Sequence, residues 1–495
     1  MTPSTKQTAI YDCWENEDCN ILTEAVAGAG KTSTLIGLLE RSKWRTLFLA
    51  FNKSIQTEIE EIIKARKFNH AKALTLHSLG LSSIREYYRI SINNNKKWDI
   101  LKRFKDFHEN DFRHLSYKKK MSVYFTLMDM LDVYRIYCSV SYESLVRDMN
   151  SMGKYVPDIV EEEKMRFYWE HFKDIYRDAT FKDEGSKIDI DFMDMIFIPV
   201  MSDEIKIAIK PYYLFVDECQ DLNIVQHLFI EKLLSQGDVR KWVAVGDSRQ
   251  SIYGFSGSYS KSFEMFKEKE NVKTFPLDVC YRSAKNIVEQ ANLVYPVMTA
   301  FQEERGYVGT EKDISLIKPA SMVVCRNTAP LIDLYFNLIS LGKEVYIKGE
   351  DILSPTINYL KKSKNSTVKK VLRELGQEIE SVSEKKNDNQ RIRYYVLSSH
   401  YENITTLANY LNRLSVDDLL EDLKDIANKS KQSNAIELST IHKSKGREAD
   451  VVYILEEKLI PSPFAVTPEQ IQQEINLKYV ARTRAKKELY YLNLK

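Results

Sequence analysis

A short loop of glycine and alanine constrains the fold of this 495-residue chain more than any other feature. Residues 23–39, "TEAVAGAGKTSTLIGLL", run from an apolar, strand-like approach through the loop into a segment with helical period. Because residues 27–30 carry almost no side chain, backbone N–H groups can converge on one point, at which the following helix aims its N-terminus. Such a nest suits a polyphosphate.

Two side chains at the end of the loop fit the same ligand. Lys31 would lie over the β- and γ-phosphates of a nucleotide, and the Thr32 hydroxyl could ligate Mg²⁺. The strict pattern G-x-x-x-x-G-K-[ST] begins with glycine, whereas this chain has Ala25 at that position. The alternative is a strand-to-helix turn with a solvated lysine, so a second nucleotide-binding element is needed to decide.

The segment "YYLFVDECQD" supplies that second element. Its apolar run is typical of a strand buried in a parallel sheet, and it ends in Asp217 and Glu218. Both carboxylates should emerge at the carboxyl edge of the sheet, where open α/β folds bind ligands. One acid can hold Mg²⁺ through water, and the next can orient or deprotonate an attacking water. An isolated Asp-Glu pair would indicate a helix cap, but the lysine loop favours the nucleotide interpretation.

Composition limits the classes of protein to which the chain can belong. Its 43% hydrophobic and 29% charged residues are ordinary for a soluble globular protein. The net charge of +2 conceals 72 basic and 70 acidic residues, so a nucleic-acid surface would have to be a local patch. The six cysteines form no C-x-x-C pair, which argues against zinc and against a disulfide framework.

The same sequence predicts where the protein works. No apolar run reaches membrane-spanning length, and the N-terminus lacks a signal-like segment. We therefore expect an intracellular protein without a membrane partner. It would be cytoplasmic in a bacterial or phage-infected cell and nuclear in a eukaryote.

Alternating strands and helices indicate an α/β protein with two cores. Residues 21–80 read as strand, helix, strand, helix and strand, whereas residues 81 to about 190 are charged and helical in period, without buried strands. Strand patterns return at residues 212–218, 242–247, 321–326, 435–440, 450–455 and 488–494. Residues 350–432 are polar and lysine-rich and predict a small insertion with mobile loops. Each core is thus expected to be interrupted once.

Six motifs in this order resemble those of the UvrD/Rep-type superfamily 1 DNA helicases. They are "AVAGAGKT", "VDECQD", "VGDSRQSIYGFSG", "CYRSAKNIV", "TIHKSKGREAD" and "LKYVARTRAKKELY". The resemblance implies two RecA-like parallel-sheet motor domains, each with an inserted, mainly helical subdomain. The predicted ranges are 1–80 with 187–275 for motor domain 1A, 81–186 for insertion 1B, 276–349 with 433–495 for motor domain 2A, and 350–432 for a reduced insertion 2B. The variants "LAFNKSI" and "TIHKSKG" are nearer the F-box DNA helicase and phage-encoded branch.

The resemblance also implies an ATP and Mg²⁺ site. The residues expected to carry out hydrolysis are Lys31, Asp217, Glu218, Gln250, Arg282 and Arg484. The residues expected to contact the nucleotide are Gln7, Ala27, Gly28, Ala29, Gly30, Lys31, Thr32, Ser33, Tyr281, Arg282, Glu448 and Arg484. Thr32 and Asp217 would hold the metal, and Glu218 would be the catalytic base. Because the two arginines lie in the second core, ATP binding would close the cores and deliver them, a contribution of about 10³–10⁵ in rate.

A second set of positions is expected to meet single-stranded DNA. Such strands are held by basic grooves together with aromatic faces on which bases stack. Phe255 resembles the family's stacking aromatic, with Tyr253 two residues before it. The full predicted set is Asn52, Lys53, His77, Tyr253, Phe255, His442 and Lys443, to which Lys445 is a plausible addition.

These features predict an ATP-dependent DNA helicase or translocase moving on single-stranded DNA. Similarity of "GDSRQSIYGF" and "YVARTRA" to the 3′-to-5′ class implies that direction. The expected partners are single strands, single-strand/duplex junctions, and a single-strand-binding protein or a recombination or replication factor. Three alternatives remain: a translocase that strips proteins with weak unwinding, a DNA-independent NTPase, and a non-hydrolysing DNA-binding scaffold.

Overall fold

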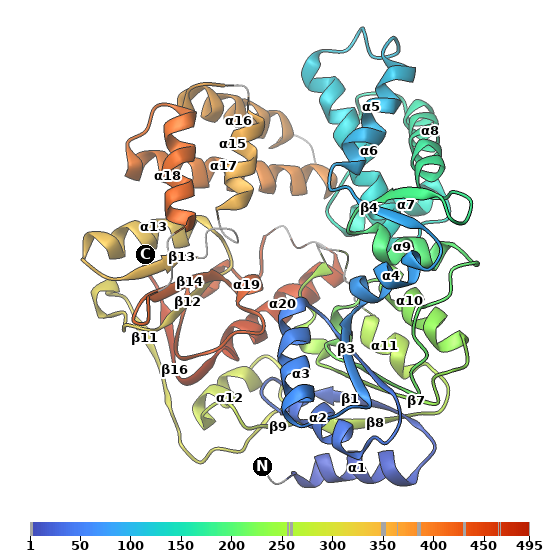
Figure 1. The fold of residues 1–495 in the computed structure, drawn as a ribbon. Helices are drawn as coiled ribbons and strands as arrows, with labels where there is room; N and C mark the ends of the chain where they lie inside the picture. Colours follow the sequence, from blue (N-terminus) through green and yellow to red (C-terminus); the bar gives the residue numbers. More distant parts are fainter. Residues whose placement is uncertain are drawn as a thin grey trace. The chain divides into compact units, whose positions relative to one another are not determined.

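The computed structural model describes residues 3–254, 257, 261–347, 353–363, 365–383, 388–428, 432–463, 465 and 467–494. These residues form two compact units (Figure 1). The first comprises Met1–Ala25 and Gly30–Leu277, and the second comprises Val26–Ala29 and Asp278–Lys495. The finer division into four subdomains stays a prediction.

A six-stranded sheet forms the centre of the first unit. Its order is β3-β2-β6-β7-β1-β8, and neighbouring strands run parallel. Strands β2 and β7 are buried at every residue, as expected for parallel strands covered on both faces. The strands are β1 (Asn20–Ala25), β2 (Thr46–Ala50), β3 (Ala71–Thr75), β6 (Tyr213–Val216), β7 (Lys241–Gly246) and β8 (Val272–Leu277).

Capped helices follow several of these strands. Asn52, Thr75 and Asn223 each accept a backbone N–H in the first turn of the helix they precede, which fixes where that helix begins. Thr75 is why "ALTLH" changes from strand to helix at Leu76. The helices are α1 (Thr5–Asn16), α2 (Lys31–Arg41), α3 (Lys53–Ala65), α4 (Leu76–Arg85), α9 (Asp194–Met201), α10 (Ile224–Ser235) and α11 (Ser262–Lys267).

Four further helices lie between α4 and α9. They are α5 (Lys96–His108), α6 (Tyr117–Tyr137), α7 (Tyr142–Ser151) and α8 (Glu162–Thr180), and they stand together in Figure 1. A small parallel ribbon of β4 (Arg89–Ile92) and β5 (Lys187–Ile190) closes the base of this insertion. The expectation that residues 81–190 contain no buried strand was wrong here, because Ile188 and Ile190 of β5 are buried.

A buried ion-pair network joins the helical insertion to α9. Arg135 of α6 donates from Nη1 to both carboxylate oxygens of Asp191 at 2.8 Å and to Asp194 Oδ1 at 3.0 Å. Lys96 of α5 donates from Nζ to Asp194 Oδ2 at 2.5 Å and to Thr180 Oγ1 at 2.7 Å. Because these cations are almost fully buried, removal of one partner would leave an uncompensated charge. The network therefore holds the segment from Asp191 to Asp194 against α5 and α6.

The second unit repeats the parallel arrangement. Its six-stranded sheet has the order β11-β16-β15-β12-β14-β13, and a two-stranded ribbon pairs β9 with β10. The strands are β9 (Val279–Cys280), β10 (Thr299–Ala300), β11 (Tyr307–Glu311), β12 (Met322–Cys325), β13 (Val345–Ile347), β14 (Ile436–Thr440), β15 (Ala449–Leu455) and β16 (Ala485–Leu492). The predicted fold class, α/β with parallel sheets in two units, is confirmed.

Helices of the second unit include an insertion between β13 and β14. That insertion contains α15 (Ser354–Lys362), α16 (Val368–Ser383), α17 (Asp388–Leu411) and α18 (Val416–Asn428), which cluster in Figure 1. Its buried side chains Leu375, Ile404 and Leu423 share one hydrophobic core with Leu334 of α13 (Ala329–Ser340). Elsewhere in the described part of this unit lie the helices α12 (Lys285–Asn292), α19 (Ile441–Ser444) and α20 (Pro468–Arg482).

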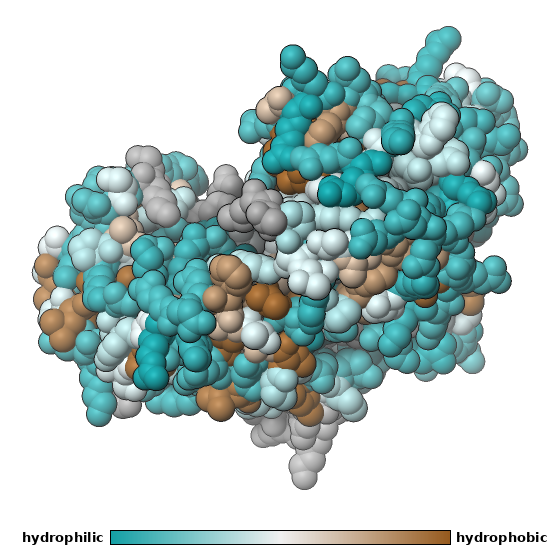
Figure 2. Space-filling view, turned by 90° about the horizontal axis from the view of Figure 1, so that it is seen from below, coloured by the Kyte–Doolittle hydropathy of each residue, from teal (hydrophilic) through white to brown (hydrophobic). Residues whose placement is uncertain are grey.

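The face drawn in Figure 2 is predominantly hydrophilic, with hydrophobic side chains in scattered patches. Within the part of the chain that the structure describes, no helix is both long and apolar enough to cross a membrane.

His227 of α10 makes the first unit sensitive to acid. Its Nε2 and Ser262 Oγ share a hydrogen bond of 2.6 Å, and Ser262 Oγ donates to Cys219 O, so Nε2 must carry the proton. Burial, reinforced by the charge of Lys269, lowers the pKa of His227 to about 4. Between pH 4 and the ordinary value of 6.5 the unfolded chain therefore binds more protons, and the free energy of unfolding falls as pH drops.

We expect this single histidine to account for about 1 kcal/mol of stability lost between pH 7.5 and pH 5.5. The measurement is urea unfolding of the wild type and of His227→Gln at both pH values. The variant should lose less stability on acidification than the wild type. An equal loss in both proteins would show that His227 does not bind the proton.

Candidate nucleotide and nucleic-acid site

The loop between β1 and α2 has the backbone that a phosphate nest requires. Gly28 and Gly30 adopt φ values of 72° and 83°, in the left-handed region that favours glycine, and Gly30 caps α2. Ala25 is the last residue of β1, pairs with Leu277 in the sheet and is fully buried. Because Ala25 is an ordinary strand residue, the departure from the strict glycine pattern costs no backbone strain.

Lys31, the first residue of α2, is held by the predicted catalytic base. Its Nζ donates to Glu218 Oε2 at 2.6 Å, and the two side chains are 13% and 22% exposed. Burial alone would lower the pKa of Lys31, but the charges of Glu218, Asp217 and Asp247 raise it above its ordinary value. Lys31 is therefore a fixed positive charge that can exchange one oxyanion, the carboxylate, for another, a phosphate.

Asp217 follows the end of β6 and is 3% exposed. Burial and the neighbouring Glu218 raise its pKa to about 7. A buried acid whose ionisation is opposed by a neighbouring carboxylate would be stabilised in its charged form by a further cation. The hard oxygen donors of Asp217 and of Thr32, in the first turn of α2, suit Mg²⁺.

Backbone geometry aims the two acids in different directions. Glu218 has a φ of 49°, which is uncommon for a residue with a side chain, and its N–H donates to Asp217 Oδ1 at 2.9 Å. The left-handed turn lets Glu218 reach Lys31 while Asp217 stays buried at the strand end. An outlier of this kind at a strand end is typical of a functional position.

A hydrogen-bond relay that the sequence did not predict runs from Glu218 to Gln250. Gln220 Nε2 donates to Glu218 Oε2 at 2.7 Å, and Asp247 N–H donates to Gln220 Oε1 at 3.0 Å. Gln250 Nε2 then donates to Asp247 Oδ2 at 2.8 Å. The relay depends on Gly246, where an added Cβ would lie 2.5 Å from Gln220 Oε1. The one signal available beforehand was a polar side chain two residues after the Asp-Glu pair.

Gln7 of α1, one of the residues predicted to contact the nucleotide, lies beside the loop. Its Nε2 donates to Thr34 Oγ1 at 3.0 Å, and a Cβ added to Gly30 would lie 3.4 Å from that nitrogen. Ser4 caps α1 and holds Gln7 through a reciprocal pair of hydrogen bonds. Ser33 is exposed on the first turn of α2.

The second unit contains the two predicted arginines in different states. Arg282 forms an ion pair from Nε to Glu448 Oε2, and Lys486 Nζ reaches Glu448 Oε1 at 2.8 Å. Burial opposes ionisation of Glu448, but Lys486 and Arg282 lower its pKa below the ordinary value. Arg484 is 2% exposed and donates to the carbonyl oxygens of Val480 and Arg447, both at 3.0 Å. A phosphate-binding role would require Arg484 to exchange these partners.

Residues 26–29 of the loop belong to the second unit by their packing. The N–H of Ala27 donates to Tyr479 Oη at 3.1 Å, and the N–H of Tyr281 donates to Gly28 O at 2.9 Å. A Cβ on Gly28 would lie 2.6 Å from Arg282 Cβ, so only glycine permits this approach. The ring of Tyr281 packs on Phe301 with centroids 4.7 Å apart.

Four residues of the first unit that are predicted to bind single-stranded DNA are the polar Asn52 and Lys53 and the aromatic Tyr253 and Phe255. Asn52 accepts the N–H of Ile55 and caps α3, so its side chain has a structural task, while Lys53 Nζ donates to Gln56 Oε1 at 3.2 Å. The ring of Tyr253 stacks on Phe51, with centroids 6.4 Å apart. Phe255 lies outside the described residues.

His77, at the start of α4, stacks on an aromatic residue that the sequence did not single out. The ring of Phe192 lies 3.7 Å from that of His77 at 15°, and Phe192 is 58% exposed. Burial lowers the pKa of His77 to about 4, so the imidazole is neutral at physiological pH. Asp191 and Asp194, which flank Phe192 in the chain, are both locked by Arg135. An exposed aromatic face is thus held on a rigid base.

His442 and Lys443 lie on α19 of the second unit. Burial, together with Arg326 and Lys443, lowers the pKa of His442 to about 3, so this histidine is also neutral. Lys443 is exposed, and its N–H donates to the capping hydroxyl of Thr440. The cation at this position is therefore Lys443 rather than His442.

Two family models match the chain: the UvrD/REP helicase N-terminal domain over residues 5–271 and the UvrD-like helicase C-terminal domain over residues 435–492. The ATP-dependent DNA helicase Rep of Buchnera aphidicola subsp. Schizaphis graminum is 24% identical, over 96% of this chain and 91% of that protein.

Shorter stretches resemble other curated proteins. The ATP-dependent DNA helicase PcrA of Staphylococcus epidermidis is 34% identical over 112 residues, which are 21% of this chain and 15% of PcrA. DNA helicase II of Escherichia coli is 39% identical over 80 residues, which are 16% of this chain and 11% of that protein. In these two cases the match spans a small part of the relative.

Proposed function

Because the chain belongs to the UvrD/REP helicase family, we propose that it is an ATP-dependent DNA helicase or translocase that moves along single-stranded DNA. The family predicted from the six motifs is confirmed by the match over residues 5–271. The observation that carries the proposal is the ion pair of Lys31 with Glu218 beside the buried Asp217. These three groups are the parts that phosphoryl transfer needs: a phosphate-binding cation, a base and a metal-binding acid.

The proposed reaction uses the residues of the first unit as follows. The γ-phosphate would replace Glu218 as the partner of Lys31, which frees the carboxylate of Glu218 to orient and deprotonate water. Mg²⁺, held by Thr32 and Asp217, would neutralise charge on the phosphate oxygens. Gln250 is linked to Glu218 by hydrogen bonds through Asp247 and Gln220. A change in the hydrogen bonding of Glu218 would therefore be transmitted to the loop that contains Gln250. Gln7 would select adenine.

The second unit supplies the remaining charges in this proposal. Arg282 would leave Glu448 for the γ-phosphate, and Glu448 would accept a hydrogen bond from the ribose. Arg484 would give up its backbone partners for the same phosphate. Closure of the units around ATP and opening after product release would then drive the motor.

We further propose 3′-to-5′ movement, on the similarity of the motifs around Gln250 and Arg484 to that class. A strand-displacement assay with 3′-tailed, 5′-tailed and protein-blocked substrates tests this directly. ATP-dependent displacement of the 3′-tailed substrate alone supports the proposal. Clearance of bound protein without duplex separation would favour the protein-stripping translocase, and ATP hydrolysis unaffected by DNA would favour the DNA-independent NTPase.

We expect the face of Phe192 to stack a base, and Phe192→Ala to weaken single-strand binding by about tenfold, because base stacking contributes ~1–3 kcal/mol. Fluorescence anisotropy with a labelled oligonucleotide measures the affinity. The matched control is Phe107→Ala, which removes an aromatic side chain that is 70% exposed on α5. Equal affinities of the two variants would remove Phe192 from the strand-binding surface.

A further inference from the structure

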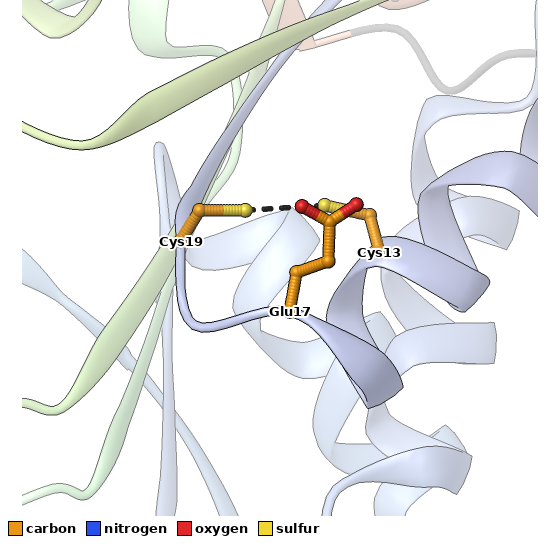
Figure 3. A group of neighbouring side chains, drawn as sticks. All are labelled: Cys13, Glu17 and Cys19. Carbon is orange, nitrogen blue, oxygen red and sulfur yellow. Dashed lines mark hydrogen bonds between the residues drawn. The ribbon is translucent and has the colours of Figure 1, made fainter.

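The turn between α1 and β1 gathers three possible metal ligands. Cys13 lies on α1, Glu17 follows its last residue, and Cys19 precedes β1. The two Sγ atoms are 3.2 Å apart, and the two sulfurs and a Glu17 carboxylate oxygen all lie within 4.8 Å of one another (Figure 3). Among the residues that the structure describes, this is the one group of three or more His, Cys, Asp or Glu side chains gathered so closely.

Contacts from distant strands hold this turn in place. Lys241 of β7 donates from Nζ to the carbonyl oxygens of Trp14, at 2.8 Å, and Glu17. Asn271 Nδ2 donates to Asp18 O at 2.6 Å. The ligand positions are therefore set by the sheet rather than by the turn alone, which is the preorganisation that a metal site requires.

We propose that Cys13, Cys19 and Glu17 bind one thiophilic divalent cation, for which Zn²⁺ is the best fit, with water completing the coordination. Two sulfurs and one carboxylate oxygen are a donor set that zinc accepts. Bonds of ~2.3 Å to tetrahedral zinc would place the sulfurs about 3.8 Å apart, so they need to separate by roughly half an ångström. Cys13 and Glu17 also line a surface hollow of about 590 Å³, which gives the ion a route of entry.

Metal binding would replace two protons and one ion pair at this turn. The two thiol protons leave to water, and Glu17 gives up its ion pair with Lys273 in favour of the metal. Sequence spacing concealed this arrangement, because five residues separate Cys13 from Cys19 and the fold, not a C-x-x-C turn, brings them together.

The test uses the full chain, purified with reductant, stripped by a chelator and titrated with Co²⁺ as a spectroscopic probe for zinc. We expect one equivalent to produce thiolate-to-cobalt absorption, and added Zn²⁺ to bleach it. Cys13→Ser and Cys19→Ser should abolish the absorption, whereas Cys138→Ser, a half-buried cysteine at the end of α6, should retain it. A Mg²⁺ site built from oxygen ligands cannot produce this band.

Glu17→Gln separates ligation from folding, because Glu17 is exposed and its replacement leaves both sulfurs in place. We expect it to keep the thiolate band but to lower metal affinity by about tenfold or more. Three results would overturn the proposal: no thiolate band in the wild type, an unchanged band in both serine variants, or an unchanged affinity in Glu17→Gln. Detection by mass spectrometry of a Cys13–Cys19 disulfide that prevents loading would also overturn it.

Discussion

Lys31→Ala should reduce ATP turnover by about 10²–10³-fold or more while leaving single-strand binding largely intact, since loss of one preorganised charge at the transition state costs this much. Lys31 is a buried cation whose charge interacts with the carboxylates of Asp217, Glu218 and Asp247. The substitution therefore removes the cation that would bind the phosphate. It also removes positive charge that offsets the negative charge of these acids. Steady-state phosphate release, with and without single-stranded DNA, measures the effect.

The control for this experiment is Lys43→Ala, an exposed lysine just after α2 that changes charge equally without touching the site. It should hydrolyse ATP at the wild-type rate. If Lys31→Ala also retained turnover, the glycine-alanine loop would not be a phosphate site. Retained DNA affinity in the same variant shows that the loss lies in chemistry and not in folding.

We expect Glu218→Gln to slow hydrolysis by roughly 10²–10⁴-fold while ATP still binds, because general-base catalysis contributes on this scale. The replacement is close in shape, so the left-handed backbone at position 218 and the contact with Lys31 can persist. The amide cannot accept a proton from water. The variant should then stay in its ATP-bound form and bind ATP more tightly than ADP.

Single-turnover hydrolysis and nucleotide binding by fluorescence separate these two effects. Glu61→Gln, an exposed substitution on α3, controls for the change of charge. A wild-type single-turnover rate in Glu218→Gln would exclude Glu218 as the base and leave it as the resting partner of Lys31.

The sequence was sufficient for the parts of the site that lie at strand ends. Lys31 and Asp217 could be placed because apolar runs identify buried parallel strands, and residues just after them meet at one edge of the sheet. The ion pair of Lys31 with Glu218 confirms that the two motifs converge. The roles of the individual residues, Phe255 included, stay predictions.

Features that depend on tertiary packing could not be predicted in this way. The pattern around residues 81–190 is helical, and β4 and β5 are strands of four residues that pair across about a hundred residues of sequence, which no local pattern reveals. Gln220 is significant only because Gly246 leaves room for its side chain. The sequence did not single out Phe192, because its exposure and its stacking on His77 arise only in the folded chain.

The buried Arg484 is linked by hydrogen bonds to the segment that contains Lys443. Its guanidinium binds the carbonyl oxygen of Arg447, and the side chain of Arg447 in turn binds the carbonyl oxygen of Lys443. If a phosphate draws Arg484 away, the segment that leads to Lys443 loses one of the hydrogen bonds that hold it. Phosphate binding by Arg484 would then alter the backbone that positions Lys443, and hydrogen bonds over a few residues would couple ATP binding to contact with DNA.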